Sequence, residues 1–397
     1  MKITHLSPFL QDDAGRVITD LAVGQRAMGH QVTVIASRTG VPGYRNCQEH
    51  LDRLDASGVT TYLADSLFVR DYAANLSVVR LLGDVVGHHD GPDLLHSHGI
   101  VSGIISLLFA GRHRRPMGLV HTLHDWHVQK TAGMVAADVH VLNLMDRVAT
   151  PTSHAAALLR GLGVFGGHLR VVPQGVSEAR GELDLGDRAV IEHMRRARKR
   201  GALVLACVGT IGVHRNQAIL VSALAKLRDA AGAPSCYGVF AGDGDADELA
   251  EQIKAQGMTG QLQVRGFTRA SRLIAAEADV LVVPSRSRSQ PIEPIEAFCD
   301  RTLVLASDIP ELSEQVIDGV TGFRFAEGNV ESLARVIQIV AGKTEADRTA
   351  VIERARRRYE QSHTLRGVLD AYEQEYQVAA PGLQLRPVRR HLRAVNE

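Results

Sequence analysis

Short apolar segments alternate with longer amphipathic ones along almost the whole chain, and this alternation limits the possible folds more than any other feature. Helical patterns such as 15–28 and 74–86 lie between apolar runs typical of strands. The predicted strands are 2–5, 31–35, 60–63, 94–96, 118–122, 147–149, 169–172, 203–208, 237–241, 261–265, 279–283, 302–306 and 322–325. Such alternation predicts an α/β fold with parallel sheets covered by helices.

The alternation is interrupted once, between Gly175 and Gly201, which predicts two domains. A chain of 397 residues is long enough for both. We place the first domain at 1–180, the second at 181–364 and a last segment, with a helix and an Arg-rich tail, at 365–397. The basic run 193–200 near the junction is interpreted as a solvated helix, in preference to a nucleic-acid or membrane patch.

Composition narrows the class of protein. The formal net charge of +1 argues against bulk attraction to nucleic acid. The four cysteines lack CxxC spacing, so we expect free thiols and neither a zinc site nor a disulfide framework. The first residues lack the apolar core of a signal peptide, and no window of 18 apolar residues occurs. We therefore expect a cytoplasmic protein without stable membrane insertion.

The stretch 284–297, PSRSRSQPIEPIEA, joins an apolar strand to a helix that begins near Ile292. The free N–H groups and positive dipole end of such a helix favour an anion such as a diphosphate at the carboxyl edge of the sheet. Glu296, one turn into the helix, is placed to reach a sugar hydroxyl. The stretch thus predicts half of a sugar-nucleotide site, with an ordinary strand–helix turn as the alternative.

Motifs in both halves resemble those of the retaining GT-B glycosyltransferases called family 4. They are QVTVIAS at 31–37, LLHSHG at 94–99, LVHTLHDWH at 119–127, LRVVPQGV at 169–176, LACVGT at 205–210, GVFAGDG at 238–244, VLVVPSRS at 280–287, PIEAF at 294–298 and VIDGVTGF at 316–323. The resemblance implies two facing Rossmann-like domains, with the donor held mainly by the second and the acceptor by the first. It also implies that the last helix crosses back onto the first domain.

The resemblance assigns donor residues where the sequence matches. Glu296 fits the second carboxylate of the family's Glu-x7-Glu motif, which binds ribose hydroxyls, whereas Arg288 replaces the first. At the two positions of the cations that neutralise the diphosphate, this chain has Thr210 and Arg215. The backbone around Gln290, Pro291 and Ile292 is expected to serve the diphosphate or sugar, and that of Arg265, Gly266 and Phe267 to meet the base.

In the first domain, Gly15 corresponds to the family's glycine-rich loop near the phosphate, although this chain has one glycine there instead of two. His124 follows the strand 118–122, where the family places a histidine beside the scissile bond. Asp12 and Asp13, next to Gly15, and His98 are the candidate acceptor contacts. The carboxylates of Asp12 and Asp13 suit a polar or cationic small molecule.

Two metal interpretations are possible and both are rejected. The histidines 96, 98, 121 and 127 lie close in sequence, but alternate strand positions face opposite sides and no carboxylate completes a site. Asp243 and Asp245 have the DxD spacing of metal-dependent GT-A transferases. Since they follow a strand and precede a helix, we interpret them as a turn and helix cap. We expect no metal and no cofactor.

The resemblance therefore implies a retaining transferase that uses a nucleoside diphosphate sugar, with UDP-N-acetylglucosamine or UDP-glucose, the commonest kind of donor in such proteins, as the first choice. The family's mechanism implies front-side attack, in which a leaving phosphate oxygen helps to take the proton of the acceptor. A small polar acceptor is expected, such as an aminocyclitol or another bacterial natural product. The alternatives are a silent sugar-nucleotide-binding subunit, or a transferase with a lipid or polysaccharide acceptor, for which 103–115 is the candidate surface.

Overall fold

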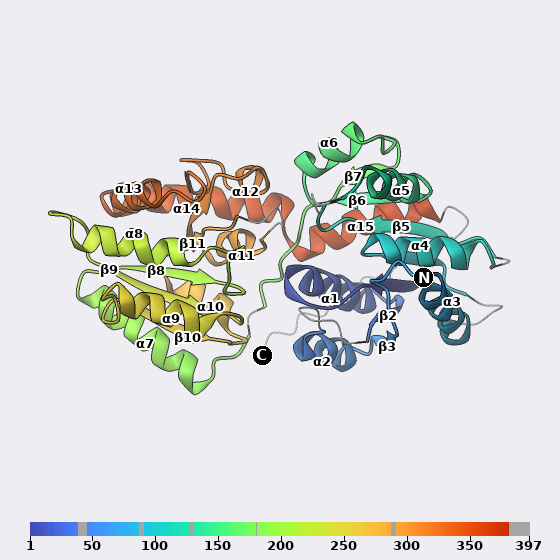
Figure 1. Cartoon of the computed structure of the whole chain (residues 1–397), viewed down its shortest axis with the longest axis horizontal. Helices are drawn as coiled ribbons and strands as arrows, with labels where there is room; N and C mark the ends of the chain where they lie inside the picture. The colour runs from blue at the N-terminus through green and yellow to red at the C-terminus, as the bar shows by residue number, and fades with distance from the viewer. Residues whose placement is uncertain are drawn as a thin grey trace. The chain divides into compact units, whose positions relative to one another are not determined.

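The computed structural model describes residues 1–38, 46–86, 91–113, 115–126, 130–179, 181–286 and 291–380. The chain forms two compact units (Figure 1). Unit 1 comprises Met1–Pro173 and the segment that begins at Leu365, and unit 2 comprises Gln174–Thr364. The boundaries expected from the sequence were after residues 180 and 364.

Unit 1 contains a seven-stranded parallel sheet with the order β3-β2-β1-β4-β5-β6-β7. The order reverses beside β1, so a switch point lies between β1 and β4, where ligands bind in open α/β sheets. The strands are β1 (Lys2–Ser7), β2 (Gln31–Ser37), β3 (Thr60–Ala64), β4 (Leu94–Ser97), β5 (Gly118–Thr122), β6 (Arg147–Thr150) and β7 (Leu169–Val171).

Helices cover both faces of this sheet. On one face α3 (Tyr72–Val86), α4 (Ile100–Ala110), α5 (Ala132–Asn143) and α6 (Ser153–Gly161) share an apolar core with the strands. On the other face lie α1 (Asp12–Ala27), α2 (Gln48–Ala56) and α15 (Leu365–Ala379). The last helix, α15, packs against α1 and β5 (Figure 1). It buries Val368, Leu369, Tyr372 and Tyr376, a spacing that puts all four on one helical face.

Unit 2 contains a six-stranded parallel sheet with the order β10-β9-β8-β11-β12-β13, and its switch point lies between β8 and β11. The strands are β8 (Leu203–Val208), β9 (Cys236–Ala241), β10 (Leu262–Gly266), β11 (Val280–Val283), β12 (Leu303–Ser307) and β13 (Phe323–Phe325). The helices are α7 (Leu185–Lys199), α8 (Ala218–Arg228), α9 (Ala246–Ala255), α10 (Ser271–Glu277), α11 (Glu293–Asp300), α12 (Pro310–Gln315), α13 (Val330–Ala341) and α14 (Glu345–Ser362). The predicted α/β class with two parallel sheets is confirmed.

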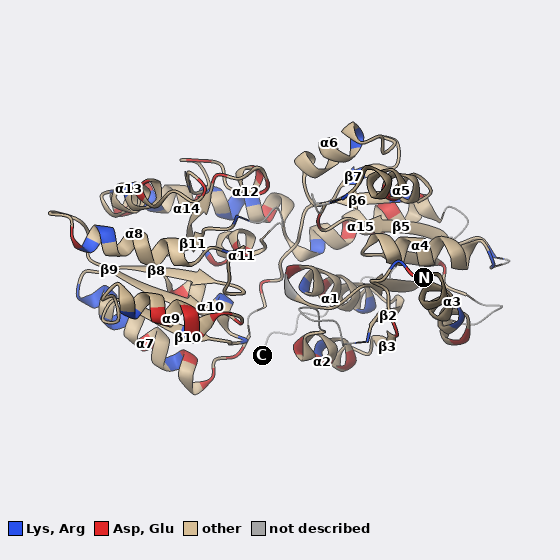
Figure 2. Ribbon diagram, viewed as in Figure 1, with Lys and Arg blue, Asp and Glu red and all other residues tan. Residues whose placement is uncertain are grey.

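The basic run 193–200 lies in the second half of α7, where Lys and Arg positions are blue on the ribbon (Figure 2). Arg195 and Arg198 both pair with Glu277, at 3.0 and 3.3 Å. Much of the positive charge is therefore balanced locally, in agreement with a solvated structural helix. The four cysteines carry free thiols, as predicted. Among the described helices none combines the length and apolar character that a membrane span requires.

Candidate functional site

The switch point of unit 2 is formed by the loops that follow β8 and β11. The backbone N–H of Arg286 donates to the carbonyl of His214 at 2.9 Å, which ties the two loops together. Asn216 adopts a left-handed conformation with φ of 54°, which completes the turn into α8. Arg215 thereby lies at the same edge as the first turn of α11.

Arg215 forms an ion pair with Glu293, the first residue of α11. Its Nη1 lies 3.1 Å from Oε1 and 3.2 Å from Oε2 of that carboxylate, and both side chains are largely buried. Gly209 has φ of 104°, a conformation that favours glycine, and a Cβ there would come within 2.5 Å of Glu293 Oε1. Sequence reasoning missed Glu293. The signal that could have identified Glu293 is its position three residues before Glu296, on the same side of the helix.

Glu296 is also buried, at 5% exposure, in the first turn of α11. Its Oε1 lies 3.9 Å from Nε of Arg272 on α10. The guanidinium of Arg272 is held more tightly by Asp300, with contacts of 2.7 and 3.1 Å, and by the carbonyl of Ser177 at 2.6 Å. Glu296 is thus a buried carboxylate that faces the guanidinium of Arg272 at a longer distance than Asp300 does.

The remaining donor candidates take different positions. Pro291 and Ile292 are buried at the start of α11, and Ile292 is its N-cap residue. Thr210 is exposed, and its carbonyl accepts a hydrogen bond from Gln217 at 2.9 Å. Arg288 and Gln290 lie outside the described residues.

Arg265 is used structurally. Its Nε donates to Asp187 at 2.9 Å and its Nη2 to Asp184 at 2.6 Å, the two carboxylates of the capping box that starts α7. Gly266 has φ of 70°, a conformation that favours glycine, and Phe267 is 61% exposed. A base bound at this strand end would therefore meet main chain and the Phe267 ring, while the Arg265 side chain remains engaged with α7.

Asp243 and Asp245 lie in the turn between β9 and α9. The Asp243 carboxylate accepts from the backbone N–H of Gly244 at 2.9 Å, and Asp245 is the N-cap residue of α9, although its side chain makes no capping bond. A Cβ at Gly244 would come within 2.2 Å of the Ile211 carbonyl. The close approach of the β8 loop explains this glycine, and the Asp243 carboxylate is engaged within the turn.

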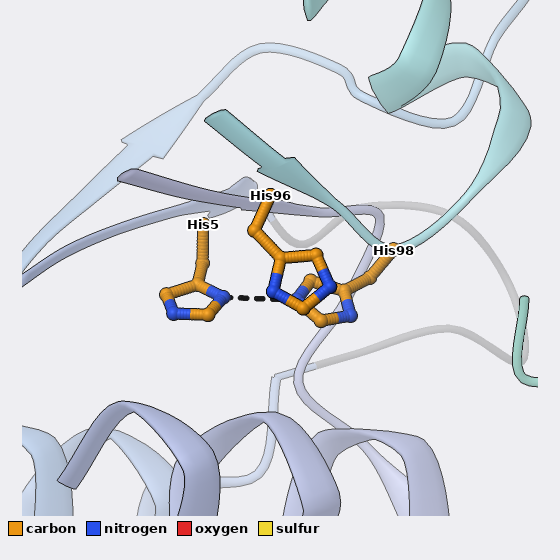
Figure 3. A group of neighbouring side chains, drawn as sticks. All are labelled: His5, His96 and His98. Atoms are coloured by element: carbon orange, nitrogen blue, oxygen red, sulfur yellow. Dashed lines mark hydrogen bonds between the residues drawn. The ribbon is translucent and has the colours of Figure 1, made fainter. Parts of the chain in front are cut away.

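The switch point of unit 1 contains a cluster of buried histidines (Figure 3). His5 on β1 and His96 on β4 are register partners in the sheet, and His98 follows β4 directly. His5 Nδ1 lies 2.9 Å from His98 Nε2, and the His96 and His98 ring centroids are 4.1 Å apart. Sequence reasoning missed His5, because only the pairing of β1 with β4 brings it beside the others.

His124, just after β5, joins this cluster. Its Nε2 lies 3.0 Å from Nδ1 of His98. Burial lowers the pKa of His124 and of His5 to about 4, and it lowers the pKa of His98 well below 6.5. The histidines are therefore neutral at pH 7, and the ring of His124 can offer either an N–H donor or a lone pair to a substrate.

The cluster corrects one argument made from the sequence. His96 and His98 share a face of the sheet, since positions two apart in a strand point the same way. His121 lies on the other face, where its Nδ1 contacts Ser97 Oγ at 2.8 Å, and His127 lies outside the described residues. One ring nitrogen from each of His5, His96 and His98 lies within 4.8 Å of the other two, a spacing suited to a metal ion. The three rings have six nitrogens in all. Each of these six ring nitrogens, however, has a hydrogen-bond partner, which an ion would displace.

The glycine turn of unit 1 differs from its expected form. Helix α1 begins at Asp12, so Gly15 lies within its first turn, and the Gly15 N–H donates to the Gln11 carbonyl at 2.8 Å. A Cβ at Gly15 would come within 2.5 Å of the Leu10 backbone. Packing of the preceding loop therefore explains this glycine. Asp13 lies half-buried in the same turn.

The predicted residues thus gather at the switch point of each sheet: Thr210, Arg215, Pro291, Ile292 and Glu296 in unit 2, and His98 and His124 in unit 1. Two family models match the chain. "Glycosyltransferase Family 4" matches residues 14–180, and "Glycosyl transferases group 1" matches 202–343.

Two of the sequence relatives have the same name. The D-inositol 3-phosphate glycosyltransferase of Nocardia farcinica is 29% identical over 304 residues, which cover 70% of this chain and 66% of the relative. The protein of that name from Mycolicibacterium gilvum is 31% identical over 246 residues, or 58% and 54% of the two chains. The chain spans about two thirds or less of the length of these relatives.

Solved structures share the fold at low identity. Anabaena HepE, in complex with UDP and glucose, has a TM-score of 0.76 at 17% identity and covers 94% of this chain and 98% of its own. A glycosyltransferase from Rickettsia africae has a TM-score of 0.75 at 16% identity and covers 96% and 99%.

Proposed function

Because this chain belongs to the GT-B glycosyltransferases of family 4, we propose that it moves a sugar from a nucleoside diphosphate to a hydroxyl of a small polar acceptor, with retention of the anomeric configuration. The observation that carries this proposal is the switch point of unit 2. There a guanidinium, Arg215, lies beside the first turn of α11, and the buried carboxylate of Glu296 lies in that turn. These groups suit a diphosphate and a ribose diol.

The proposed donor is UDP-N-acetylglucosamine or UDP-glucose. Structures of Anabaena HepE contain UDP with glucose, or UDP-glucose, on the same fold. For the acceptor, the relatives named D-inositol 3-phosphate glycosyltransferase favour a phosphorylated cyclitol. The expectation from the sequence was an aminocyclitol or another natural product. Both acceptor types present several hydroxyls on one small ring, in keeping with the polar acceptor predicted from Asp12, Asp13 and His98.

We further propose that the reaction needs neither cofactor nor divalent metal. Arg215 and the N-terminus of α11 stabilise the charge that develops on the departing diphosphate. A leaving phosphate oxygen takes the acceptor's proton during front-side attack. His124, neutral through burial, contributes a hydrogen bond beside the scissile bond and not a charge.

The test combines each of several UDP-, GDP- and ADP-linked sugars with inositol 3-phosphate, free inositol or an aminocyclitol. The quantity measured is the release of nucleoside diphosphate. We expect UDP release that depends on one acceptor class. The anomeric proton coupling of the product should show the configuration of the donor. An inverted product, or release with no dependence on any acceptor or donor, contradicts the proposal.

A second candidate, a silent sugar-nucleotide-binding subunit, is favoured by one observation. The carboxylate of Glu293 lies against Arg215, and Thr210 takes the place of the family's other cation, so the diphosphate region is less positive than usual. A silent subunit binds the UDP-sugar but neither hydrolyses nor transfers it, whereas an enzyme hydrolyses the donor slowly without acceptor. Calorimetric titration together with a long hydrolysis assay separates the two.

A further inference from the structure

A chain of hydrogen bonds connects His124 to Gln25 on α1. His124 Nε2 contacts His98 Nδ1 at 3.0 Å, His98 Nε2 contacts His5 Nδ1 at 2.9 Å, and His5 Nε2 contacts the Gln25 side-chain oxygen at 2.7 Å. The His98–His5 and His5–Gln25 links are buried, where water cannot replace a lost partner, and the His124–His98 link is partly buried. Gln25 itself is 2% exposed.

The order of protons along this chain follows from Gln25. A carboxamide oxygen only accepts, so His5 must carry its proton on Nε2. In a neutral imidazole the other nitrogen is then bare, and His5 Nδ1 accepts from His98 Nε2. By the same step His98 Nδ1 accepts from His124 Nε2. The proton of His124 is thereby assigned to Nε2, and its Nδ1 keeps a lone pair.

The amide of Gln25 is oriented in turn by the last helix. Gln25 Nε2 donates to the hydroxyl of Tyr376 on α15 at 2.7 Å. That hydroxyl lies 2.7 Å from His96 Nδ1, and His96 Nε2 lies 2.7 Å from Thr122 Oγ1. Tyr376 therefore accepts from Gln25 and donates to His96. Rotation of the amide would reverse every one of these bonds, so the network is cooperative.

We propose that Gln25 is a positioning residue of this glycosyltransferase: through His5 and His98 it holds His124 as the Nε2–H tautomer, with the Nδ1 lone pair available to accept a hydrogen bond from a substrate hydroxyl. The inference rests on the proposed function in that His124 contacts the reacting sugars. The network ends in the neutral hydroxyls of Thr122 and Tyr372, which are 2.9 Å apart. It therefore orients His124 and provides no store for a proton taken from the acceptor.

The first test needs no substrate. In protein labelled with ¹⁵N at histidine, with His124 assigned from the spectrum of His124→Gln, we expect a bare Nδ1 and a protonated Nε2 at pH 7. Gln25→Met, of similar size but unable to hydrogen-bond, should give a mixture of both tautomers. Tyr376→Phe, which removes only the hydroxyl that orients the amide, should do the same and serves if Gln25→Met does not fold. An Nδ1–H tautomer in the wild type, or an unchanged tautomer in the variants, overturns the proposal.

The second test separates positioning from a structural role. Gln25→Met should lower kcat about tenfold while the KM for the donor stays within about twofold. In a His124→Ala background the same substitution should have no further effect, because the two residues act as one unit. Ser97→Ala is the matched control, since it removes a buried hydrogen bond to His121 on the opposite face of the same strand, and it should leave kcat unchanged.

The two tests also distinguish which proposal fails. If His124→Ala leaves turnover intact, the catalytic assignment of His124 is wrong. The NMR result still shows whether the hydrogen bonds from Gln25 set the tautomer of His124. If His124→Ala is severe but Gln25→Met acts equally in both backgrounds, Gln25 only supports the fold and the positioning role is refuted.

Discussion

Two buried carboxylates in the first turn of α11 have different partners, although they are three residues apart. Glu293 pairs with Arg215 at 3.1 Å, whereas the oxygen of Glu296 lies 3.9 Å from Arg272, whose guanidinium is held by Asp300. Because Glu293 is engaged with Arg215, Glu296 is the carboxylate of this turn that we propose for the ribose hydroxyls.

Replacement of Glu296 by alanine should weaken binding of UDP by about 2–4 kcal/mol, since two charge-assisted hydrogen bonds to the ribose are lost. The fold should survive, because Arg272 keeps both contacts with Asp300. Calorimetric titration of UDP measures the effect. Glu331→Ala, which removes an exposed carboxylate from the first turn of α13, is the control and should bind like the wild type. Equal affinity of Glu296→Ala and the control would remove Glu296 from the site.

Replacement of His124 by alanine should reduce turnover at least about tenfold, with a smaller change in UDP affinity. The reason is that the residues proposed to hold the base and the ribose belong to unit 2, whereas His124 belongs to unit 1. Steady-state kinetics and a UDP titration on the same preparation give both numbers. Loss of UDP binding with normal residual turnover would show that His124 has another role.

At the scale of elements, the loops after β8 and β9 are packed against each other, and their glycines are explained by that contact. The backbone N–H of Ile211 donates to the Asp243 carbonyl at 2.6 Å, and the N–H of Asp245 donates to the Ile211 carbonyl at 3.0 Å. The backbone of Asp243 and Asp245, and not their carboxylates, therefore supports the loop that carries Arg215.

Catalysis should persist in excess EDTA, because Arg215 and the N-terminus of α11 supply the positive charge that a metal ion provides in metal-dependent transferases. Arg215→Ala should lower the rate about 100-fold or more, while Asp243→Asn combined with Asp245→Asn should change it little. Transfer assays with and without EDTA and manganese measure all three. Activity abolished by EDTA, restored by manganese and lost in the double Asn variant would instead establish a metal site at the acidic pair.

Considered as a whole, the molecule repeats one strand order in both units, with the first and fourth strands of each sheet adjacent at the switch point. The interiors differ in chemistry. Unit 1 buries several histidines: burial lowers the pKa of His5 and His50 to about 4 and of His121 to about 3. In unit 2 burial also lowers the pKa of His363.

Unit 1 should therefore lose stability first as the solution becomes acidic. An unfolded imidazole takes up a proton near pH 6.5, but these buried rings do so only near pH 4, so protonation favours the unfolded state between these values. Above pH 6.5 the effect vanishes. Between pH 6.5 and about 4, each of these histidines lowers the free energy of unfolding by up to about 1.4 kcal/mol for every unit by which the pH falls. The single tryptophan, Trp126, belongs to unit 1. The urea midpoint from its fluorescence should fall more between pH 7 and 5 than the midpoint at which the amides of β8 to β12 in unit 2 lose their protection from hydrogen exchange. Equal shifts would contradict the expectation.

The sequence was sufficient for the α/β class, the positions of the strands and the family. Apolar runs of four to six residues identify buried strands wherever they occur, because a parallel sheet is covered on both faces. Residues in the loops that follow such strands, such as Arg215 after β8 and His124 after β5, must then lie near the carboxyl edge of a sheet. Their proximity to that edge depends only on local order along the chain, and it was predictable for that reason.

The partners of these residues depended on the tertiary structure. His5 meets His96 because β1 pairs with β4, and Gln25 meets Tyr376 because α15 packs against α1, contacts that join positions 91 and 351 residues apart. The Glu293 carboxylate reaches Arg215 only because β8 and β11 are neighbours at the switch point. Strand order and helix packing are set by the burial of whole apolar faces. The partner of a single polar residue therefore cannot be predicted from its position in the sequence. The sequence alone therefore located the edges where the site residues lie, and the packing of distant elements decided which side chains bond to one another there.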